Sequence, residues 1–159
     1  MIKQGRQTAP TLDGIREDHL KRYELAISIG AENHVESVAD LGCGTGYGAY
    51  MMAKAGFMVD AFEIDPSAVA YGEQFYTAPN LKRHVADLSD GALHQHLWAG
   101  YSLATAFEFI EHTTAAELIL KQLSKEVPLL VASVPNEEVV PFESSKHRQH
   151  VRHYTPEEF

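Results

Sequence analysis

The feature that most constrains this chain is a glycine-rich turn placed directly after a short apolar run. Residues 38–41 (VADL) have the character of a buried strand, residues 47–55 have that of a helix, and between them stand Gly42, Gly44 and Gly46. Residues without a Cβ permit a sharp turn and let the backbone approach a ligand closely. A strand, a glycine turn and a helix in this order predict a nucleotide-type cofactor site at the carboxyl end of a parallel strand.

The spacing of the glycines excludes two common cofactor loops. A dinucleotide fingerprint needs a glycine at the sixth position from Gly42, where this chain has Tyr47. A phosphate loop needs Lys and Ser or Thr at the positions of Tyr47 and Gly48. An acid two residues before the glycines, Asp40, suits a ligand that carries an amino group. The alternative is a glycine-rich turn that binds no ligand.

Apolar runs alternate with helical periodicities along most of the chain. Strands are predicted at Ser37–Asp40, Val59–Glu63, Leu81–Ala86, Ser102–Phe107 and Leu129–Val134, and helices at Asp18–Ile29, Tyr47–Ala55, Pro66–Phe75, Ala92–Trp98 and Ala115–Lys125. This alternation predicts an α/β, doubly wound, mostly parallel sheet with both faces covered. Residues 1–159 form a single domain on this interpretation, with residues 1–13 as a polar, flexible arm.

Local signals mark several helix ends. Asp65 before Pro66 has the form of an N-cap, and Thr114 with Glu117 has the form of a capping box. Gly30 is expected to end the first helix.

Composition narrows the class of partner. The chain of 159 residues is 45% hydrophobic and carries a net charge of −9, which makes a broad nucleic-acid surface unlikely because such surfaces need clustered Lys and Arg. The single cysteine, Cys43, forms no disulfide within the chain and is more readily interpreted as a small loop residue than as a nucleophile. We find no signal peptide and no apolar stretch long enough to span a membrane, and we therefore expect a cytoplasmic protein.

Two motifs resemble one enzyme family. The acid-x-G-x-G-x-G loop at 40–46 resembles the first motif of class I S-adenosylmethionine-dependent methyltransferases, and FEFIEH at 107–112 resembles their fourth motif in a small-molecule branch that includes ubiquinone-biosynthesis O-methyltransferases. The resemblance spans Asp18 to Phe159 and implies the Rossmann-like methyltransferase fold. That fold normally adds two strands and a helix after the fifth strand, so the sequence fits either a truncated chain or a minimal five-stranded variant. In the minimal variant, Leu129–Val134 would be an exposed apolar edge through which a homo-oligomer could form.

The resemblance also implies a cofactor, S-adenosyl-L-methionine, with S-adenosyl-L-homocysteine as product. In the family, Asp40 orients the amino group of the cofactor, Glu63 binds its ribose, Ile64 packs on its adenine and Asp87 recognises the adenine amino group. The alternative interpretation is that Glu63 and Asp87 are ordinary acids at strand ends that bind no ligand, and that Tyr23 is a core residue. The full set of expected cofactor contacts is Tyr23, Asp40, Gly42, Cys43, Gly44, Gly46, Glu63, Ile64, Asp87, Leu88, Phe107 and Glu108.

Histidines supply the candidate catalytic groups. His112, His150 and His153 are candidates for a general base because imidazole titrates near neutral pH, although His112 before a helix equally suits a structural role. Histidines at 147, 150 and 153 would share a helical face, but their spacing is not a usual zinc pattern and no fourth ligand is evident, so no metal is expected. Lys146, Arg148 and Arg152 form either a site for an acidic substrate group or a solvated face.

The function that these residues predict is methyl transfer from S-adenosylmethionine to O or N of a small metabolite or sugar-type substrate. In-line displacement at an activated methyl group needs positioning above all, which fits a chain without an evident catalytic triad. A catalytically silent domain that binds cofactor and a partner is one alternative. A methyltransferase acting on nucleic acid or protein is the other, although base-modifying members commonly carry (N/D)-P-P-(Y/F) where this chain has FEFI.

Overall fold

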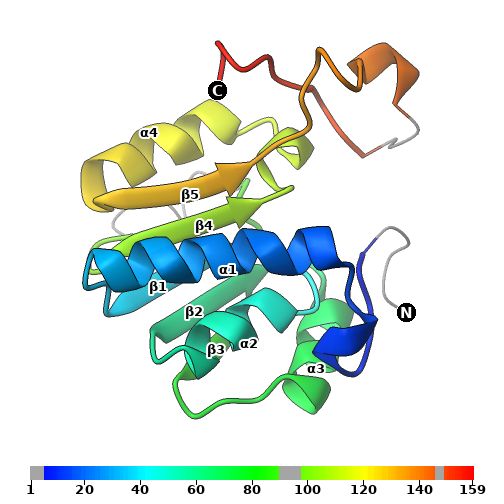
Figure 1. Ribbon diagram of the computed structural model, residues 1–159. Helices are drawn as coiled ribbons and strands as arrows, with labels where there is room; N and C mark the ends of the chain where they lie inside the picture. The colour runs from blue at the N-terminus through cyan, green and yellow to red at the C-terminus, as the bar shows by residue number, and fades with distance from the viewer. Residues whose placement is uncertain (1–5, 90–97, 146–148) are drawn as a thin grey trace.

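A computed structural model describes residues 6–89, 98–145 and 149–159 and contains one parallel sheet. The strands are β1 (Ser37–Leu41), β2 (Met58–Glu63), β3 (Leu81–Val85), β4 (Leu103–Phe107) and β5 (Leu129–Ser133). Their order is β3-β2-β1-β4-β5, and every neighbouring pair is parallel (Figure 1). The order reverses between β1 and β4, which places the topological switch point beside the glycine turn. The predicted α/β, doubly wound class is confirmed.

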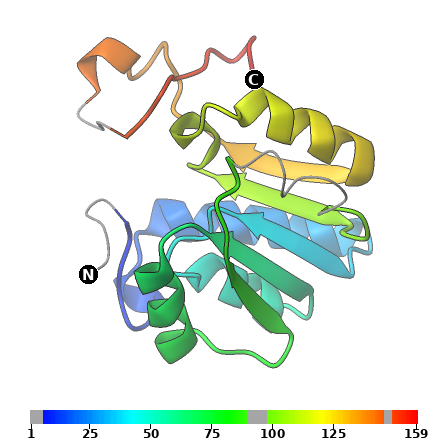
Figure 2. The same cartoon turned by 180° about the vertical axis from the view of Figure 1, so that it is seen from behind.

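Helices cover both faces of the sheet. They are α1 (Glu17–Glu32), α2 (Tyr47–Lys54), α3 (Pro66–Phe75) and α4 (Ala116–Glu126). α1 and α2 pack on one face, α4 lies on the other, and α3 runs beside β2 and β3 (Figures 1 and 2).

Side chains of alternate strand positions form two hydrophobic cores, as a sheet buried on both faces requires. Val38, Val59 and Leu103 point to the face of α1 and α2, where Met52 joins them. On the other face Leu41, Ala104, Phe62 and Trp98 pack with Ile119 and Leu123 of α4. The register pairs Val38 with Val59 on one side and with Leu103 on the other, so one row of apolar residues crosses the sheet centre.

Two predicted helix boundaries are wrong. α1 continues past Gly30 to Glu32. Gly30 lies within the helix against the Phe57 ring, where a Cβ would come within 2.9 Å of Cζ, so its small size serves packing and does not end the helix. The Thr114–Glu117 capping box does not form. Instead α4 begins after Ala115, and the Thr113 hydroxyl accepts the Ala115 amide at 3.1 Å. The N-cap at Asp65 is confirmed, since its Oδ1 accepts the Ser67 amide at 2.9 Å.

Residues 6–16 pack against the body of the protein. The Thr45 hydroxyl donates to the Gln7 carbonyl at 2.9 Å, and the Tyr76 hydroxyl donates to the Ala9 carbonyl at 2.5 Å. Ala9 and Ile15 are buried. The part of the expected arm from residue 6 onward is therefore held over the glycine turn and α3, while residues 1–5 lie outside the described residues.

Two further expectations concern the helix predicted before β4 and the strand β5. The helix predicted at Ala92–Trp98 falls largely on residues 90–97, which are outside the described residues; Trp98 itself lies in a turn with a fully buried side chain. β5 is at the edge of the sheet in the described part of the chain, the arrangement expected for the minimal variant, and carries the partly exposed Leu130. Among the described residues, no helix combines the length and apolar character needed to cross a bilayer.

Candidate functional site

A cavity of about 1240 Å³ lies at the carboxyl ends of the strands. The N-terminal segment and the segment after β5 both lie at this end of the sheet and form its rims (Figure 1). The cavity brings together most residues expected from the sequence, which are Tyr23, Gly42, Cys43, Gly44, Glu63, Ile64, Asp87, Leu88, Phe107, Glu108, His112, His150 and His153. Asp40 and Gly46 do not line it.

The glycine turn has a left-handed backbone at each alternate position. Gly42, Gly44 and Gly46 have φ of 66°, 58° and 78°, a region that L residues with a Cβ adopt at a cost. A Cβ on Gly42 would meet the Phe109 side chain at 2.5 Å, whereas a Cβ on Gly44 would meet no atom within 4 Å. The backbone at Gly44 therefore borders open space in the cavity, and a ligand can approach it as closely as its own atoms permit.

Cys43 lies within this turn as a buried neutral thiol. Burial raises its pKa well above the usual value, with further contributions from the nearby Asp40 and Glu63 carboxylates. Since a thiolate is the nucleophilic form, this environment supports the interpretation of Cys43 as a small loop residue.

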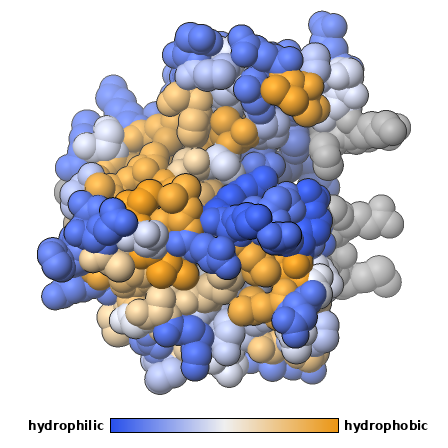
Figure 3. All heavy atoms as spheres, viewed as in Figure 1, coloured by the Kyte–Doolittle hydropathy of each residue, from blue (hydrophilic) through white to orange (hydrophobic). Residues whose placement is uncertain are grey.

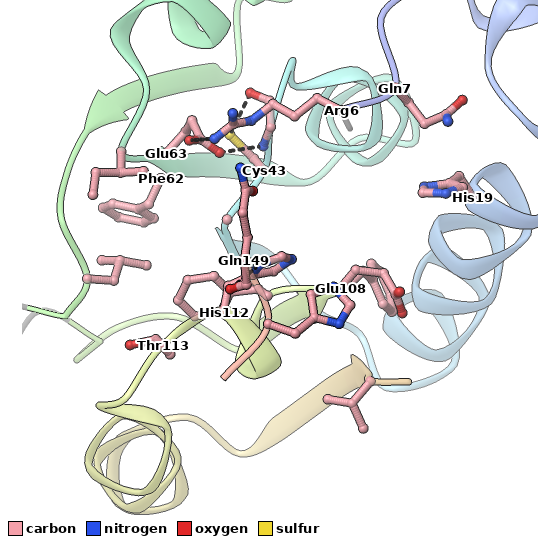
Figure 4. A pocket seen from close by; sticks show the side chains of 18 of the residues that line it. Arg6, Gln7, His19, Cys43, Phe62, Glu63, Glu108, His112, Thr113 and Gln149 are labelled. Atoms are coloured by element: carbon pink, nitrogen blue, oxygen red, sulfur yellow. Dashed lines mark hydrogen bonds and ion pairs between the residues drawn. The ribbon is translucent and has the colours of Figure 1, made fainter. Parts of the chain in front are cut away.

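Glu63 ends β2 and is almost entirely buried at the cavity wall. Its Oε2 accepts the Gly44 amide at 3.1 Å, and its Oε1 accepts the Asp65 amide at 2.8 Å. Arg6 from the N-terminal segment donates to the same Oε1 at 2.6 Å and reaches Asp65 at 3.3 Å (Figure 4). Two backbone amides thus fix the orientation of the carboxylate, and the Arg6 guanidinium donates a further hydrogen bond to Oε1.

Asp40 lies one layer beneath the cavity. Its Oδ1 accepts the Thr105 hydroxyl at 2.7 Å, and its Oδ2 accepts the Tyr23 hydroxyl at 3.3 Å. Burial raises the pKa of Asp40 to about 7, against the opposing effect of hydrogen bonds from Thr105 and Tyr23, and the Glu63 charge adds to the rise. Asp40 is therefore buried and does not line the cavity itself, but it is hydrogen-bonded to Tyr23, which does.

The Tyr23 ring is both a core residue and a cavity wall. It packs edge-on against Phe107 with centroids 4.8 Å apart, and a Cβ on Gly48 would fall within 2.0 Å of its Cζ. Gly48 therefore permits the close approach of α1 to α2 that brings Tyr23 to the cavity.

The wall after β2 and β3 combines apolar and acidic groups. Leu88 is buried, Ile64 is about half exposed, and both line the cavity beside Phe62. Asp87 accepts hydrogen bonds from the amide and hydroxyl of Ser89 at 2.9 and 2.6 Å, and these bonds lower its pKa. An apolar slot with a carboxylate at its edge suits a flat heterocycle that carries an amino group.

Sequence reasoning named Tyr23 as the residue of α1 that contacts the cofactor but missed two further residues of α1 that line the cavity, His19 and Arg22. The Arg22 guanidinium lies 3.5 Å from Glu108. The His19 ring contacts the Tyr47 hydroxyl at 3.0 Å. These residues occupy one helical face at positions i, i+3 and i+4, so the periodicity that predicted the helix also contained this signal. Arg6 had no comparable signal, because no local pattern links it to Glu63.

The candidate catalytic histidines meet on the other side of the cavity, where Figure 4 shows His112 and Gln149 across from Arg6 and Glu63. His112 Nδ1 lies 3.2 Å from the Gln149 carbonyl oxygen, and the His112 and His150 ring centroids are 4.6 Å apart. His150 Nδ1 lies 2.7 Å from His153 Nε2, and His153 Nδ1 lies 2.7 Å from the Val140 carbonyl oxygen.

A buried acid adjoins these rings. Glu111 has no exposed surface, and neither carboxylate oxygen has a hydrogen-bond partner among the described residues. Burial raises its pKa to about 8, with a further contribution from the Glu108 charge and against the opposing effect of the Arg22 charge. Ligand atoms of Glu111, His112 and His150 lie within 4.8 Å of one another, so these side chains can together hold a metal ion.

The basic cluster expected near the C-terminus is described only in part. Lys146, His147 and Arg148 lie outside the described part of the chain. Arg152 pairs with Glu158 at 2.8 Å, and its guanidinium lies 4.3 Å from the centre of the Tyr154 ring. It does not line the cavity.

Comparison with known proteins identifies the fold and the family. A family model described as a methyltransferase domain matches residues 15–159. No curated protein matches the sequence.

Several solved structures share the fold at low sequence identity. The methyltransferase domain of bacterial CtHen1 is 18% identical with a TM-score of 0.69, and the match covers 89% of this chain and 79% of that chain. Magnesium protoporphyrin IX methyltransferase from Synechocystis PCC 6803, solved with bound S-adenosylmethionine, is 18% identical with a TM-score of 0.57 over 70% of this chain and 57% of that chain. The bifunctional kinase-methyltransferase WbdD is 15% identical with a TM-score of 0.63 over 82% of this chain and 32% of that chain.

Proposed function

Because this chain belongs to the methyltransferase domain family and is a class I S-adenosylmethionine-dependent methyltransferase, we propose that its acceptor is an oxygen or nitrogen of a small metabolite or sugar-type molecule. The observation that carries the proposal is the cavity of about 1240 Å³, whose volume leaves space for a small acceptor beside the cofactor. A second observation is the net charge of −9, which disfavours a broad nucleic-acid surface.

The side chains that line the cavity have the chemistry needed to bind S-adenosylmethionine. Glu63 would hold the ribose hydroxyls, since its carboxylate is orientated by two backbone amides and faces the cavity. Leu88 and Ile64 would flank the adenine, with Asp87 at its amino group. The open space beside Gly44 would receive the amino-acid part of the cofactor. When bound, S-adenosylmethionine supplies a methyl group that is activated by the positive charge on its sulfur.

In this proposal the histidine cluster of His112, His150 and His153 supplies the base that removes a proton from the acceptor. An acceptor hydroxyl must lose its proton as the new bond forms, and a neutral imidazole can take it. His112 and His150 line the cavity, and their ring centroids are 4.6 Å apart with the ring planes nearly perpendicular. His153 has one nitrogen at the Val140 carbonyl and the other at His150, which favours an orienting role for that residue.

Calorimetric titration with S-adenosylmethionine and S-adenosylhomocysteine tests the cofactor assignment. Glu63→Ala is expected to weaken binding more than tenfold, about 1.4 kcal/mol, because hydrogen bonds to a buried charged acceptor are lost. The matched control is Glu36→Ala, which removes an exposed carboxylate at the opposite, amino end of β1. Thermal melts of both variants report whether they fold. Equal affinities for wild type and Glu63→Ala would mean that the ribose lies elsewhere.

Transfer of a labelled methyl group distinguishes the classes of acceptor. We expect label in the small-molecule fraction of a cell extract. Incorporation into RNA or protein instead would support a macromolecular methyltransferase, and tight cofactor binding without any transfer would support a catalytically silent domain.

A further inference from the structure

The turn at Ile110–His112 and the segment 149–153 form a cluster of imidazoles around one buried acid. The two segments are joined by a backbone hydrogen bond of 2.7 Å from the Val151 amide to the Glu111 carbonyl. This bond places His112 and His150 side by side, with ring planes nearly perpendicular at 87°. The cluster is therefore fixed by main-chain contacts as well as by its side chains.

Glu111 is the unusual member of the cluster. Its side chain is fully buried, and both carboxylate oxygens are without a hydrogen-bond partner in the ranges 6–89, 98–145 and 149–159. Buried polar groups are normally hydrogen-bonded, because loss of hydration without compensation is unfavourable. A buried carboxylate with two unsatisfied oxygens lacks the partner that would stabilise it, and a cation is the partner that best matches its chemistry.

When the three rings are neutral, their hydrogen bonds determine which ring nitrogen carries the proton. A carbonyl oxygen only accepts, so His153 Nδ1 donates to Val140 O and His153 Nε2 is an acceptor. His150 Nδ1 therefore donates to His153 Nε2, which makes His150 Nε2 an unprotonated nitrogen. By the same reasoning His112 Nδ1 donates to Gln149 O, and His112 Nε2 is unprotonated.

These tautomers are those that a metal site requires. A histidine ligand usually donates its other ring N–H to a carbonyl, a carboxylate or a further group that fixes its orientation. His112 has a carbonyl in that position, and His150 has His153, which in turn is held by a carbonyl. Ligand atoms of Glu111, His112 and His150 lie within 4.8 Å of one another, close enough to share one ion.

We propose that Glu111, His112 and His150 bind a divalent transition-metal cation on the acceptor side of the cavity, with His153 as a positioning residue for His150. Two imidazoles with one carboxylate favour Mn²⁺, Co²⁺ or Zn²⁺ over Mg²⁺ and Ca²⁺, which prefer sets of oxygen ligands. Both histidines line the cavity, so the ion would face a bound acceptor.

The proposal changes the role of two candidate catalytic residues. A nitrogen that coordinates a metal cannot also accept a proton, so His112 and His150 would act as ligands. A divalent cation there would polarise an oxygen of the acceptor directly as a Lewis acid. The inference does not rest on the identity of the acceptor or on the placement of the cofactor.

Titration of the whole, EDTA-stripped protein with Co²⁺ tests the site. We expect one equivalent to bind, with visible absorption bands from the coordinated ion and an accompanying rise in melting temperature. Glu111→Gln keeps the shape of the side chain and removes its charge, and His150→Ala removes a ring; each is expected to weaken Co²⁺ binding at least tenfold. His153→Ala should weaken it less and alter the absorption bands, as loss of a positioning partner predicts.

The control variant is His84→Ala. His84 pairs with Asp60 at 2.5 Å outside the cavity, so its loss removes an imidazole beside a carboxylate without touching the cluster. Circular dichroism identifies any variant that fails to fold, and His112→Asn then provides a second ligand substitution. Absence of stoichiometric binding by the wild type, or equal binding by wild type and Glu111→Gln, would overturn the proposal. Titration with S-adenosylmethionine in EDTA is independent of these results, so failure of the metal site is distinguishable from failure of the proposed function.

Discussion

At the scale of single residues, the site is organised around carboxylates in different environments. Glu63 is held by backbone amides and by Arg6 at the cavity wall. Asp40 is buried one layer below and interacts with Tyr23 and Thr105. Because the charge of a carboxylate is stabilised by donors and opposed by desolvation, these environments give the two acids separate roles.

Asp40 makes the stability of the protein depend on pH. Its pKa is raised to about 7 in the folded protein by burial, whereas the usual value is 3.8. The folded state therefore holds a proton that the unfolded chain has lost, so this contribution to stability is complete below about pH 4 and is lost as pH rises through 7. We expect Asp40→Asn, whose amide oxygen still accepts from Thr105, to flatten the melting temperature between pH 5 and 8.

The difference in stability between Asp40→Asn and the wild type is expected to be largest at pH 8. There Asp40→Asn should be the more stable protein in denaturant titrations, by on the order of 1–3 kcal/mol. A variant whose stability falls between pH 5 and 8 as steeply as that of the wild type would show that another group titrates.

Arg6 occupies part of the carboxylate that we assign to the ribose. Its ion pair with Glu63 is partly exposed to solvent, so its strength is modest. Arg6→Ala is therefore expected to raise the affinity for S-adenosylmethionine about two- to fivefold by removing a competitor, as measured by calorimetry. The control is Arg152→Ala, which removes an arginine outside the cavity. A fall in affinity would mean that Arg6 contacts the cofactor.

At the scale of elements, the strand–turn–helix unit β1–α2 determines where the cofactor can lie. The turn combines three left-handed glycines with an amide that orientates Glu63 from the neighbouring strand. β1 and β2 are paired in register from Ser37 with Met58 to Leu41 with Phe62, so the turn and Glu63 emerge at the same level. The position of the carboxylate thus follows from strand pairing.

Gly44 offers a test in which strain and ligand contact can be separated. Gly44 and Gly56 both have positive φ, of 58° and 108°, and a Cβ on either would meet no atom within 4 Å. Gly44→Ala and Gly56→Ala should each lose about 1–2 kcal/mol of stability through backbone strain. Only Gly44→Ala should lose cofactor affinity, by tenfold or more in calorimetry, because only Gly44 lines the cavity. Equal affinities for the two variants would show that the cofactor does not approach this turn.

At the scale of the whole molecule, the sheet ends in a partly exposed edge strand. β5 pairs only with β4 in the described part of the chain, and Leu130 on β5 is 39% exposed. Figure 3 shows apolar atoms on the side of the molecule that Figure 1 presents to the viewer. Unpaired apolar edges favour association with another chain.

We propose that two copies of the chain associate through β5. Sedimentation velocity should show a concentration-dependent shift toward a dimer for the wild type. Leu130→Lys places a charge at the edge and should keep the protein monomeric at the same concentrations. Leu118→Lys, on an exposed position of α4, is the matched control. A wild type that sediments as a monomer at all concentrations would contradict the proposal.

Much of the fold followed from patterns of short range. Apolar runs of strand length predicted every strand to within a residue at each end. The alternation of these runs with helices predicted the parallel class of the sheet, and Asp65 before Pro66 predicted the start of α3. These signals are local because strand burial and turn geometry depend on residues that are neighbours in sequence. Gly30 misled for the same reason, since its small size serves the distant Phe57 ring and not a helix end.

The sequence by itself determined the family, the cofactor loop and the acids that follow each strand, because the carboxyl ends of parallel strands always share one edge of the sheet. Only the tertiary structure decided that Asp40 is hydrogen-bonded to Tyr23, that Arg6 reaches Glu63, and that Glu111 is buried beside His112 and His150. Each of these contacts joins segments that are far apart in the chain or depends on burial from several sides. No local pattern encodes such contacts, since they arise when distant segments are packed at the same end of the sheet.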